Sequence, residues 1–185
     1  MKRWSIVLGC FALLSGLWWG LWHPANRIQV VSPLIGHVVP TQIVAWWQAS
    51  NEQASEEQVI FPEELYGHVT LVHFFASWCL YCRTEMPVWL DIAADRTLDI
   101  QRIGVAYKDQ SDALTIFLNT YGNPFQAIVW DPMGKLGLAW GVYGTPETFL
   151  IGPQGEMLAK WVGPLSETLW ANHIRPLIQQ REQRI

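Results

Sequence analysis

Two cysteines that directly follow an apolar run constrain the fold more than any other feature of the sequence. Residues 71–76 have the composition of a buried strand, and Cys79 and Cys82 come where a helix is expected to begin. The first turn of a helix carries unpaired N–H groups and a partial positive charge, which favour a thiolate over a thiol. Side chains three positions apart lie on one helix face, and disulfide Cα atoms are about 4.4 to 6.8 Å apart. The pattern therefore predicts a redox-active pair in which Cys79 is the nucleophile and Cys82 closes the disulfide.

A metal site is the alternative interpretation of this pair. Structural zinc usually takes four Cys or His ligands, and the chain offers no second pair, because its third cysteine is Cys10, inside the apolar N-terminal stretch. A thiolate copper carrier is the strongest metal-binding rival, since soft thiolates suit Cu(I). We therefore predict a redox dithiol without a resident metal or other cofactor.

The start of the chain predicts a membrane anchor. Lys2 and Arg3 precede the uncharged stretch 4–22, which at about 1.5 Å per residue is long enough to cross a hydrocarbon core of roughly 30 Å. The basic residues would stay in the cytoplasm, and the tryptophans at both ends would lie at the membrane interfaces. A cleaved signal peptide is the alternative, but residues 21–25 lack a small-x-small cleavage site.

Both interpretations of the N-terminus export the rest of the chain. In a bacterium the dithiol would then lie on the periplasmic side of the inner membrane, where a reductant needs electrons supplied across that membrane. The formal net charge of −4 gives no reason to expect a nucleic-acid partner. We therefore expect protein and membrane partners only.

Segments of strand and helix length alternate along most of the chain. After the anchor at 1–22 and a linker with an N-terminal extension at 23–57, we expect one domain over 58–185, and the polar stretch 48–58 predicts a surface loop or insertion. The elements expected in the domain are strands at 69–75, 100–106, 127–130, 147–151 and 156–162, and helices at 79–94, 111–121, 135–140 and 167–179. This alternation predicts an α/β fold with a mixed, mainly parallel central sheet and flanking helices.

The order of these elements is that of the thioredoxin-like fold, and several segments resemble one family with this fold. Residues 76–87 resemble the active-site helix of membrane-anchored thioredoxin-like proteins. Residues 141–151, Gly-Val-Tyr-Gly-Thr-Pro-Glu-Thr-Phe-Leu-Ile, are similar almost residue for residue to the signature of thiol:disulfide interchange proteins of cytochrome c maturation, the DsbE/CcmG type of the TlpA-like superfamily. Residues 32–36 and 107–109 also resemble that family.

The resemblance implies a protein-disulfide reductase that keeps the Cys-x-x-Cys-His haem-attachment site of apocytochrome c reduced, or resolves its mixed disulfides. Its partners would be apocytochrome c, haem-handling maturation proteins and a DsbD- or CcdA-like transmembrane electron donor. A general periplasmic thiol-disulfide reductase with other clients is the nearest alternative. The chain departs from the family at Leu80 and Tyr81, because the family usually has a Pro-containing pair between the cysteines.

The resemblance also implies a binding surface beside the dithiol. Pro146 would form a cis peptide bond with Thr145 and would expose the Thr145 backbone, so that a substrate chain can pair with it as an added strand. Trp78 would shield the dithiol. The alternatives are an ordinary trans turn at Pro146 and a packing role for Trp78.

Three titratable residues are candidates for handling the proton of Cys82. The resemblance implies that Glu147 lies near the active site, where it could assist proton transfer; the alternative is a solvated strand end. Glu85 lies three positions beyond Cys82, where a carboxylate would favour the thiol over the thiolate; the alternative is a charge on a solvated helix surface. The ring of His73 could shuttle the same proton, although a satisfied core histidine is the simpler interpretation.

Overall fold

The computed structural model describes residues 14–16, 18, 32–48, 53–61 and 63–182. Among these residues, no helix is long and apolar enough to cross a membrane. Apart from 14–16 and 18, the predicted anchor at 1–22 lies outside the described residues. The fold described below therefore concerns the chain from residue 32 onward.

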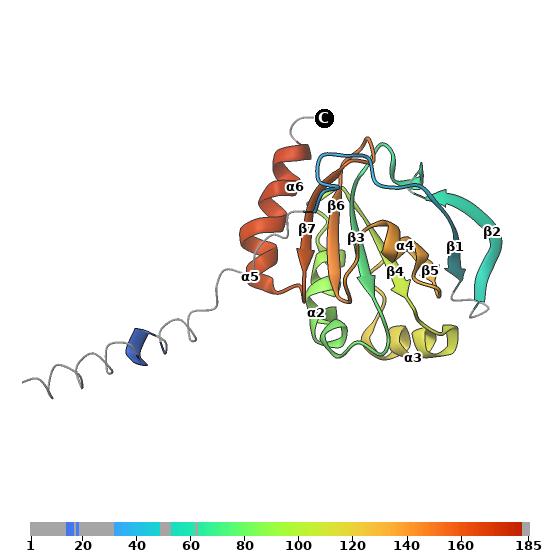
Figure 1. Cartoon of the computed structure of the whole chain (residues 1–185), viewed down its shortest axis with the longest axis horizontal. Coiled ribbons are helices and arrows are strands. Elements are labelled where there is room, and N and C mark those ends of the chain that lie inside the picture. Colours follow the sequence, from blue (N-terminus) through green and yellow to red (C-terminus); the bar gives the residue numbers. More distant parts are fainter. Residues whose placement is uncertain (1–13, 17, 19–31, 49–52, 62, 183–185) are drawn as a thin grey trace, which may run out of the picture.

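In the described part of the chain, seven strands form one sheet in the order β2-β1-β5-β4-β3-β6-β7 (Figure 1). The strands are β1 (Gln42–Gln48), β2 (Gln53–Phe61), β3 (Val69–Phe75), β4 (Ile100–Tyr107), β5 (Ala127–Asp131), β6 (Glu147–Ile151) and β7 (Met157–Val162). β4 pairs in parallel with β3 and with β5, whereas the other pairings of described strands are antiparallel. The prediction of a mainly parallel sheet is therefore wrong. Parallel neighbours need a crossover connection. Helix α2 (Leu80–Ala94) connects β3 with β4 and α3 (Ser111–Tyr121) connects β4 with β5, whereas α4 (Lys135–Ala139) leads from β5 to β6, which runs antiparallel to β3.

The described residues of the polar stretch 48–58 form strand rather than the predicted surface loop. The first residue of the stretch ends β1, and from Gln53 onward it is part of β2, while 49–52 lie outside the described residues. β1 and β2 pair as antiparallel neighbours, with Val44 opposite Val59. β2 lies at the edge of the sheet, where a strand pairs on one side only and polar residues are tolerated. The predicted linker and extension, 23–57, thus contains β1 and the first half of β2.

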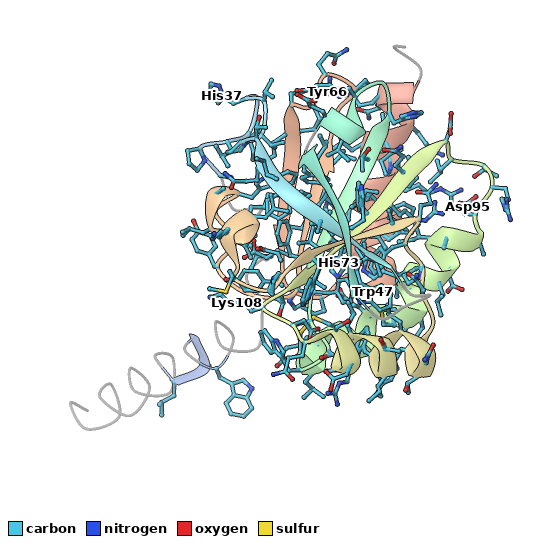
Figure 2. All side chains as sticks on the ribbon, turned by 90° about the vertical axis from the view of Figure 1, so that its right-hand side faces the viewer. His37, Trp47, Tyr66, His73, Asp95 and Lys108 are labelled. Atoms are coloured by element: carbon cyan, nitrogen blue, oxygen red, sulfur yellow. A yellow bond between two sulfur atoms is a disulfide. The ribbon has the colours of Figure 1, made fainter. Side chains whose placement is uncertain are left out.

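Helices cover both faces of the sheet. They are η1 (Glu63–Leu65), α2 (Leu80–Ala94), α3 (Ser111–Tyr121), α4 (Lys135–Ala139), α5 (Glu167–Leu169), the π-helical turn η2 (Trp170–Ile174) and α6 (Arg175–Glu182). Residues of α2, α3 and α6 pack against Leu71 and Phe75, whereas α4 packs against Val72 and Phe74. Successive side chains of a strand point to opposite faces, so β3 separates an α2 face from an α4 face, and side chains fill both (Figure 2).

β3 and β6 bring two segments that are distant in sequence to the same end of the sheet. The strands are antiparallel, and Phe74 pairs with Glu147. The chain that leaves β3 towards Cys79 therefore lies beside the chain that enters β6 from Pro146. His73 pairs with Thr148 in the same ladder, so these two side chains point to the α2 face, and the side chain of Glu147 points to the α4 face.

Candidate active site

Cys79 and Cys82 form a disulfide at the start of α2, with their Cα atoms 5.3 Å apart. Cys79 is the N-cap residue of the helix, and the backbone N–H of Cys82 donates to Cys79 Sγ over 3.1 Å. Cys79 is 5% exposed, whereas Cys82 is completely buried. The structure thus shows the oxidised state, in which Cys79 is the sulfur nearer to solvent.

A buried carboxylate fixes the turn that leads into Cys79. The N–H and the hydroxyl of Ser77 donate to the two carboxylate oxygens of Asp109, over 2.5 and 2.6 Å. The guanidinium of Arg83 donates to the carbonyl of Ser77 over 2.9 Å. Residues 107–109 resemble the family in sequence, but that likeness assigns no role to Asp109. The available signal was a carboxylate shortly after β4, the strand that pairs with β3 and therefore ends beside the dithiol.

Exposed apolar side chains flank the disulfide. Trp78, Leu80 and Tyr81 are 56%, 67% and 61% exposed. The indole Nε1 of Trp78 donates to the carbonyl of Lys108 over 3.1 Å, which fixes the ring at the surface. Trp78 therefore lies beside Cys79 rather than in the core, and the two residues that depart from the family pattern face solvent.

The Thr145–Pro146 peptide bond is cis, as the resemblance implies. The carbonyl of Pro146 accepts from the N–H of Gly163 over 2.9 Å. Among the described residues, no backbone group pairs with Thr145, and the buried Thr145 Oγ1 has no hydrogen-bond partner. Thr145 therefore offers unpaired polar groups at the end of the sheet where the disulfide lies.

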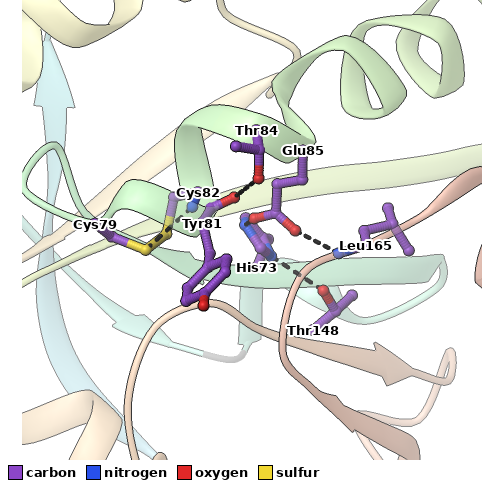
Figure 3. A network of polar contacts seen from close by, with 8 residues as sticks. All are labelled: His73, Cys79, Tyr81, Cys82, Thr84, Glu85, Thr148 and Leu165. Atoms are coloured by element: carbon purple, nitrogen blue, oxygen red, sulfur yellow. Dashed lines mark hydrogen bonds and ion pairs between the residues drawn. A yellow bond between two sulfur atoms is a disulfide. The ribbon is translucent and has the colours of Figure 1, made fainter. Parts of the chain in front are cut away.

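His73 of β3 and Glu85 on the buried side of α2 form a buried ion pair (Figure 3). His73 Nε2 lies 2.8 Å from Glu85 Oε1, and both side chains are at most 1% exposed. The other carboxylate oxygen of Glu85 accepts from the N–H of Leu165 over 2.6 Å, and His73 Nδ1 lies 3.0 Å from Thr148 Oγ1. The interpretation of Glu85 as a charge on a solvated helix surface is therefore wrong. Both ring nitrogens of His73 have partners, as expected of a satisfied core histidine, and its role as a proton shuttle stays a prediction.

This pair lies close to the resolving cysteine in an aromatic environment. Glu85 is one turn beyond Cys82 on the buried side of α2. The His73 ring packs against Trp89, with centroids 4.6 Å apart, and stacks on Phe125 at 5.9 Å. Electrostatic interactions in such a low-dielectric interior are strong. The structure thus brings His73 and Glu85 next to the dithiol, although their hydrogen bonds run to protein groups other than the sulfurs.

A second buried ion pair lies on the opposite face of the sheet. Glu147 Oε2 is 2.9 Å from Lys160 Nζ, and both side chains are at most 1% exposed. Glu147 Oε1 accepts from the N–H groups of Tyr143 and Gly144, over 2.8 and 3.3 Å. Glu147 is therefore not a solvated strand end. Lys160 is not among the residues predicted for the site. Its one signal in the sequence is a lysine between the apolar residues 159 and 161.

The protein has a disulfide at the first turn of a helix, and a cis-proline lies beside it on the neighbouring strand of a mixed α/β sheet. These features define the class of thioredoxin-like thiol-disulfide oxidoreductases. The AhpC/TSA family matches residues 42–160. The thiol:disulfide interchange protein DsbE of Allochromatium vinosum is 34% identical over 178 residues, which cover 96% of this chain and 93% of that protein. The chain thus belongs to the AhpC/TSA family and, within it, to the DsbE-type thiol:disulfide interchange proteins.

Two further comparisons agree with this assignment. The thiol:disulfide interchange protein CycY of Rhizobium leguminosarum bv. viciae is 53% identical over 98 residues. That match covers 53% of this chain and 52% of the relative, so it spans about half the length of each. A solved structure of a putative thioredoxin from Neisseria meningitidis has a TM-score of 0.63 at 25% identity, and covers 79% of this chain and 93% of that one.

Proposed function

We propose that the protein is a membrane-anchored periplasmic reductase that keeps the haem-attachment cysteines of apocytochrome c reduced. The observation that carries the proposal is the Cys79–Cys82 disulfide at the start of α2, at the same end of the sheet as the cis-proline Pro146. The relatives CycY and DsbE are named thiol:disulfide interchange proteins, which supports this activity. The resemblance of residues 141–151 to the cytochrome c maturation signature supports apocytochrome c as the client.

The reaction consists of two successive thiol–disulfide exchanges. The thiolate of reduced Cys79 attacks one sulfur of the client disulfide, forms a mixed disulfide and displaces the other client sulfur, which takes up a proton. The thiolate of Cys82 then attacks Cys79 Sγ, closes the intramolecular disulfide and releases the second client sulfur as a thiol. The client disulfide gains two electrons and the protein dithiol loses two. The helix N-terminus and the N–H of Cys82, which points at Cys79 Sγ, stabilise the attacking thiolate.

The client chain binds beside the cis-proline. Its backbone pairs with the unpaired groups of Thr145 as an added strand. This places a client cysteine in front of Cys79, the more exposed of the two sulfurs. The exposed side chains of Trp78 and Tyr81 flank that position and contact apolar groups of the client.

The electrons come from a membrane partner. The disulfide must be reduced before each cycle, and a dithiol of a DsbD- or CcdA-like transmembrane donor supplies the two electrons by the same exchange chemistry. The uncharged stretch 4–22 serves as a single-pass anchor in the inner membrane. The anchor keeps the reductase beside this donor and beside the haem-handling maturation proteins on the periplasmic side.

Trapping of the mixed disulfide tests the proposal. Cys82→Ser removes the resolving sulfur, so client proteins should remain attached to Cys79 when the full chain is produced in a bacterium that makes c-type cytochromes. The expected captives are c-type apocytochromes and haem-handling proteins, identified by mass spectrometry after non-reducing separation. The matched control, Cys79→Ser with Cys82→Ser, should capture none.

Two outcomes would replace the proposal. A varied set of captured clients without apocytochrome c would identify a general periplasmic reductase. Stoichiometric Cu(I) retained through purification, together with no exchange against a peptide disulfide, would identify a thiolate metal carrier instead.

A further inference from the structure

Lys160 is a buried lysine that the exchange reaction does not use. It lies in β7 opposite Phe149 of β6 and is 1% exposed. Its side chain therefore lies on the α4 face of the sheet, whereas Cys82 and Glu85 pack on the α2 face. Burial of an ammonium group is costly unless its charge is paired and its donors are satisfied. The partners of Lys160 therefore show what this charge holds in place.

The ammonium of Lys160 contacts both ends of the loop that carries the cis-proline. It donates to the carbonyl of Gly141 over 2.7 Å at the start of the loop. At the end of the loop it pairs with Glu147 over 2.9 Å, and the same carboxylate accepts from the N–H groups of Tyr143 and Gly144. The Lys160–Glu147 pair thus makes three hydrogen bonds to the backbone of the loop, at Gly141, Tyr143 and Gly144.

The ammonium also fixes an aromatic side chain of the same loop. Lys160 Nζ lies 4.3 Å from the centroid of the Tyr143 ring, a cation–π distance. Tyr143 is 75% exposed, so the ring covers the buried ammonium while most of its surface stays accessible to solvent. Lys160 therefore sets the position of an exposed ring two residues before Thr145.

We propose that Lys160 is a positioning residue that holds loop 141–146 in the shape that binds an extended disulfide-containing chain. The proposal rests on the proposed function in one respect, the pairing of the client backbone with Thr145. Lys160 acts through Glu147, the carbonyl of Gly141 and the ring of Tyr143. Since the sheet separates it from α2, Lys160 governs the binding of the client and leaves the reactivity of the dithiol unchanged.

Two disulfide substrates separate binding from dithiol chemistry. An extended peptide disulfide needs the loop, whereas bis(2-hydroxyethyl) disulfide has no peptide backbone and meets Cys79 alone. We expect Lys160→Met to raise the KM for the peptide by about 10- to 100-fold, because small displacements of positioning groups have effects of this size. The rate with bis(2-hydroxyethyl) disulfide and the reduction potential should stay at their wild-type values.

Matched variants control for charge and for general effects of substitution. Lys160→Arg keeps a cation and N–H donors at the site, so it should restore part of the affinity for the peptide. Lys135→Met removes an exposed lysine at the start of α4 and should leave both rates unchanged.

A double variant keeps the test decisive if Lys160→Met does not fold. Glu147→Gln with Lys160→Met removes both buried charges, and the glutamine carbonyl can still accept from the N–H groups of Tyr143 and Gly144. This variant should fold and should still show a raised peptide KM, because Gly141 and the Tyr143 ring lose their cation.

The proposal is overturned if either Met variant binds the peptide as wild type does, or if both disulfides slow by the same factor. The proposed function fails differently. In that case the wild-type protein would show no preference for a Cys-x-x-Cys-His peptide over an unrelated extended peptide disulfide, while the effect of Lys160→Met on either peptide would persist.

Discussion

The two faces of the sheet each bury one ion pair, and the two pairs contact different parts of the site. On the α2 face, His73 of β3 pairs with Glu85 of the helix that carries Cys82. On the α4 face, Glu147 and Lys160 hold the loop that ends in Pro146. Both pairs are almost fully buried, yet one lies next to the sulfurs and the other next to the loop that carries Pro146.

This difference suggests a separate role for each face of the sheet, one in tuning the dithiol and the other in fixing the loop. We expect a charge on the α2 face to act on the thiolate of Cys82 through a low-dielectric interior. A charge on the α4 face is separated from the sulfurs by the sheet, so it acts by fixing the backbone of the loop. Substitutions in the α2-face pair should therefore change redox properties, and substitutions in the α4-face pair should change client binding.

Lys160→Met should have the largest effect on stability. It leaves the carboxylate of Glu147 buried without its cation, and breaking a buried pair in this way lowers the free energy of unfolding by about 3 to 5 kcal/mol. Urea unfolding measures the loss, and Glu147→Gln added to Lys160→Met should recover most of it. A loss well below this range in Lys160→Met would mean that the charge of Glu147 reaches solvent or another partner.

Asp109→Ala should have the next largest effect and should act on the dithiol side only. It leaves the buried N–H of Ser77 without an acceptor, which costs about 1 to 3 kcal/mol. Ser77→Ala is the matched control, because it removes the hydroxyl and keeps the N–H bond to Asp109, and it should cost less. Equal losses in the two variants would show that the backbone bond contributes little.

Substitutions in the α2-face pair should shift the reduction potential in opposite directions. His73→Asn weakens the compensation of the Glu85 charge, disfavours the nearby thiolate and should make the protein more reducing. Glu85→Gln removes the charge, favours the thiolate and should make the protein less reducing. We expect shifts of about 30 mV, equivalent to about 1.4 kcal/mol, in equilibration with glutathione buffers. Shifts of the same sign would contradict an electrostatic role.

The exposed pair between the cysteines should have the smallest effect on the fold. Leu80→Pro with Tyr81→Thr restores the usual family pair, and Leu80 is the first residue of α2, where proline is well tolerated. Because both side chains face solvent, the free energy of unfolding should change by less than about 0.5 kcal/mol. A larger loss in thermal unfolding would show that Leu80 or Tyr81 packs against one of the buried pairs.

The parts of the fold that were predictable are those with strong local patterns. The helix predicted at 111–121 matches α3, and the strands predicted at 69–75 and 147–151 match β3 and β6. The edge strand β2 was missed because backbone pairing with one neighbour needs no apolar pattern. The parallel character of the sheet was overestimated because strand direction depends on which neighbours pair, which local patterns do not reveal.

The dithiol could be located from sequence, whereas the state of the charged residues around it could not. Cys79 and Cys82 form a local motif at a strand–helix junction. The burial of Glu85 depends on His73, which is twelve positions earlier, and the burial of Glu147 depends on Lys160, which is thirteen positions later. Such partners become visible only when strand register is known, and a lysine inside an apolar strand was the one local sign of the second pair.

The central claim is that Cys79 of the reduced protein transfers its electrons to a haem-attachment disulfide. The most direct test mixes reduced protein with an oxidised Cys-x-x-Cys-His peptide and follows a single turnover by acid quenching and mass analysis. The account predicts one peptide disulfide reduced for each protein molecule, a mixed disulfide on Cys79 that accumulates in Cys82→Ser, and no reaction in Cys79→Ser. A peptide that stays oxidised with the wild-type protein, or that Cys79→Ser reduces at the wild-type rate, would contradict it.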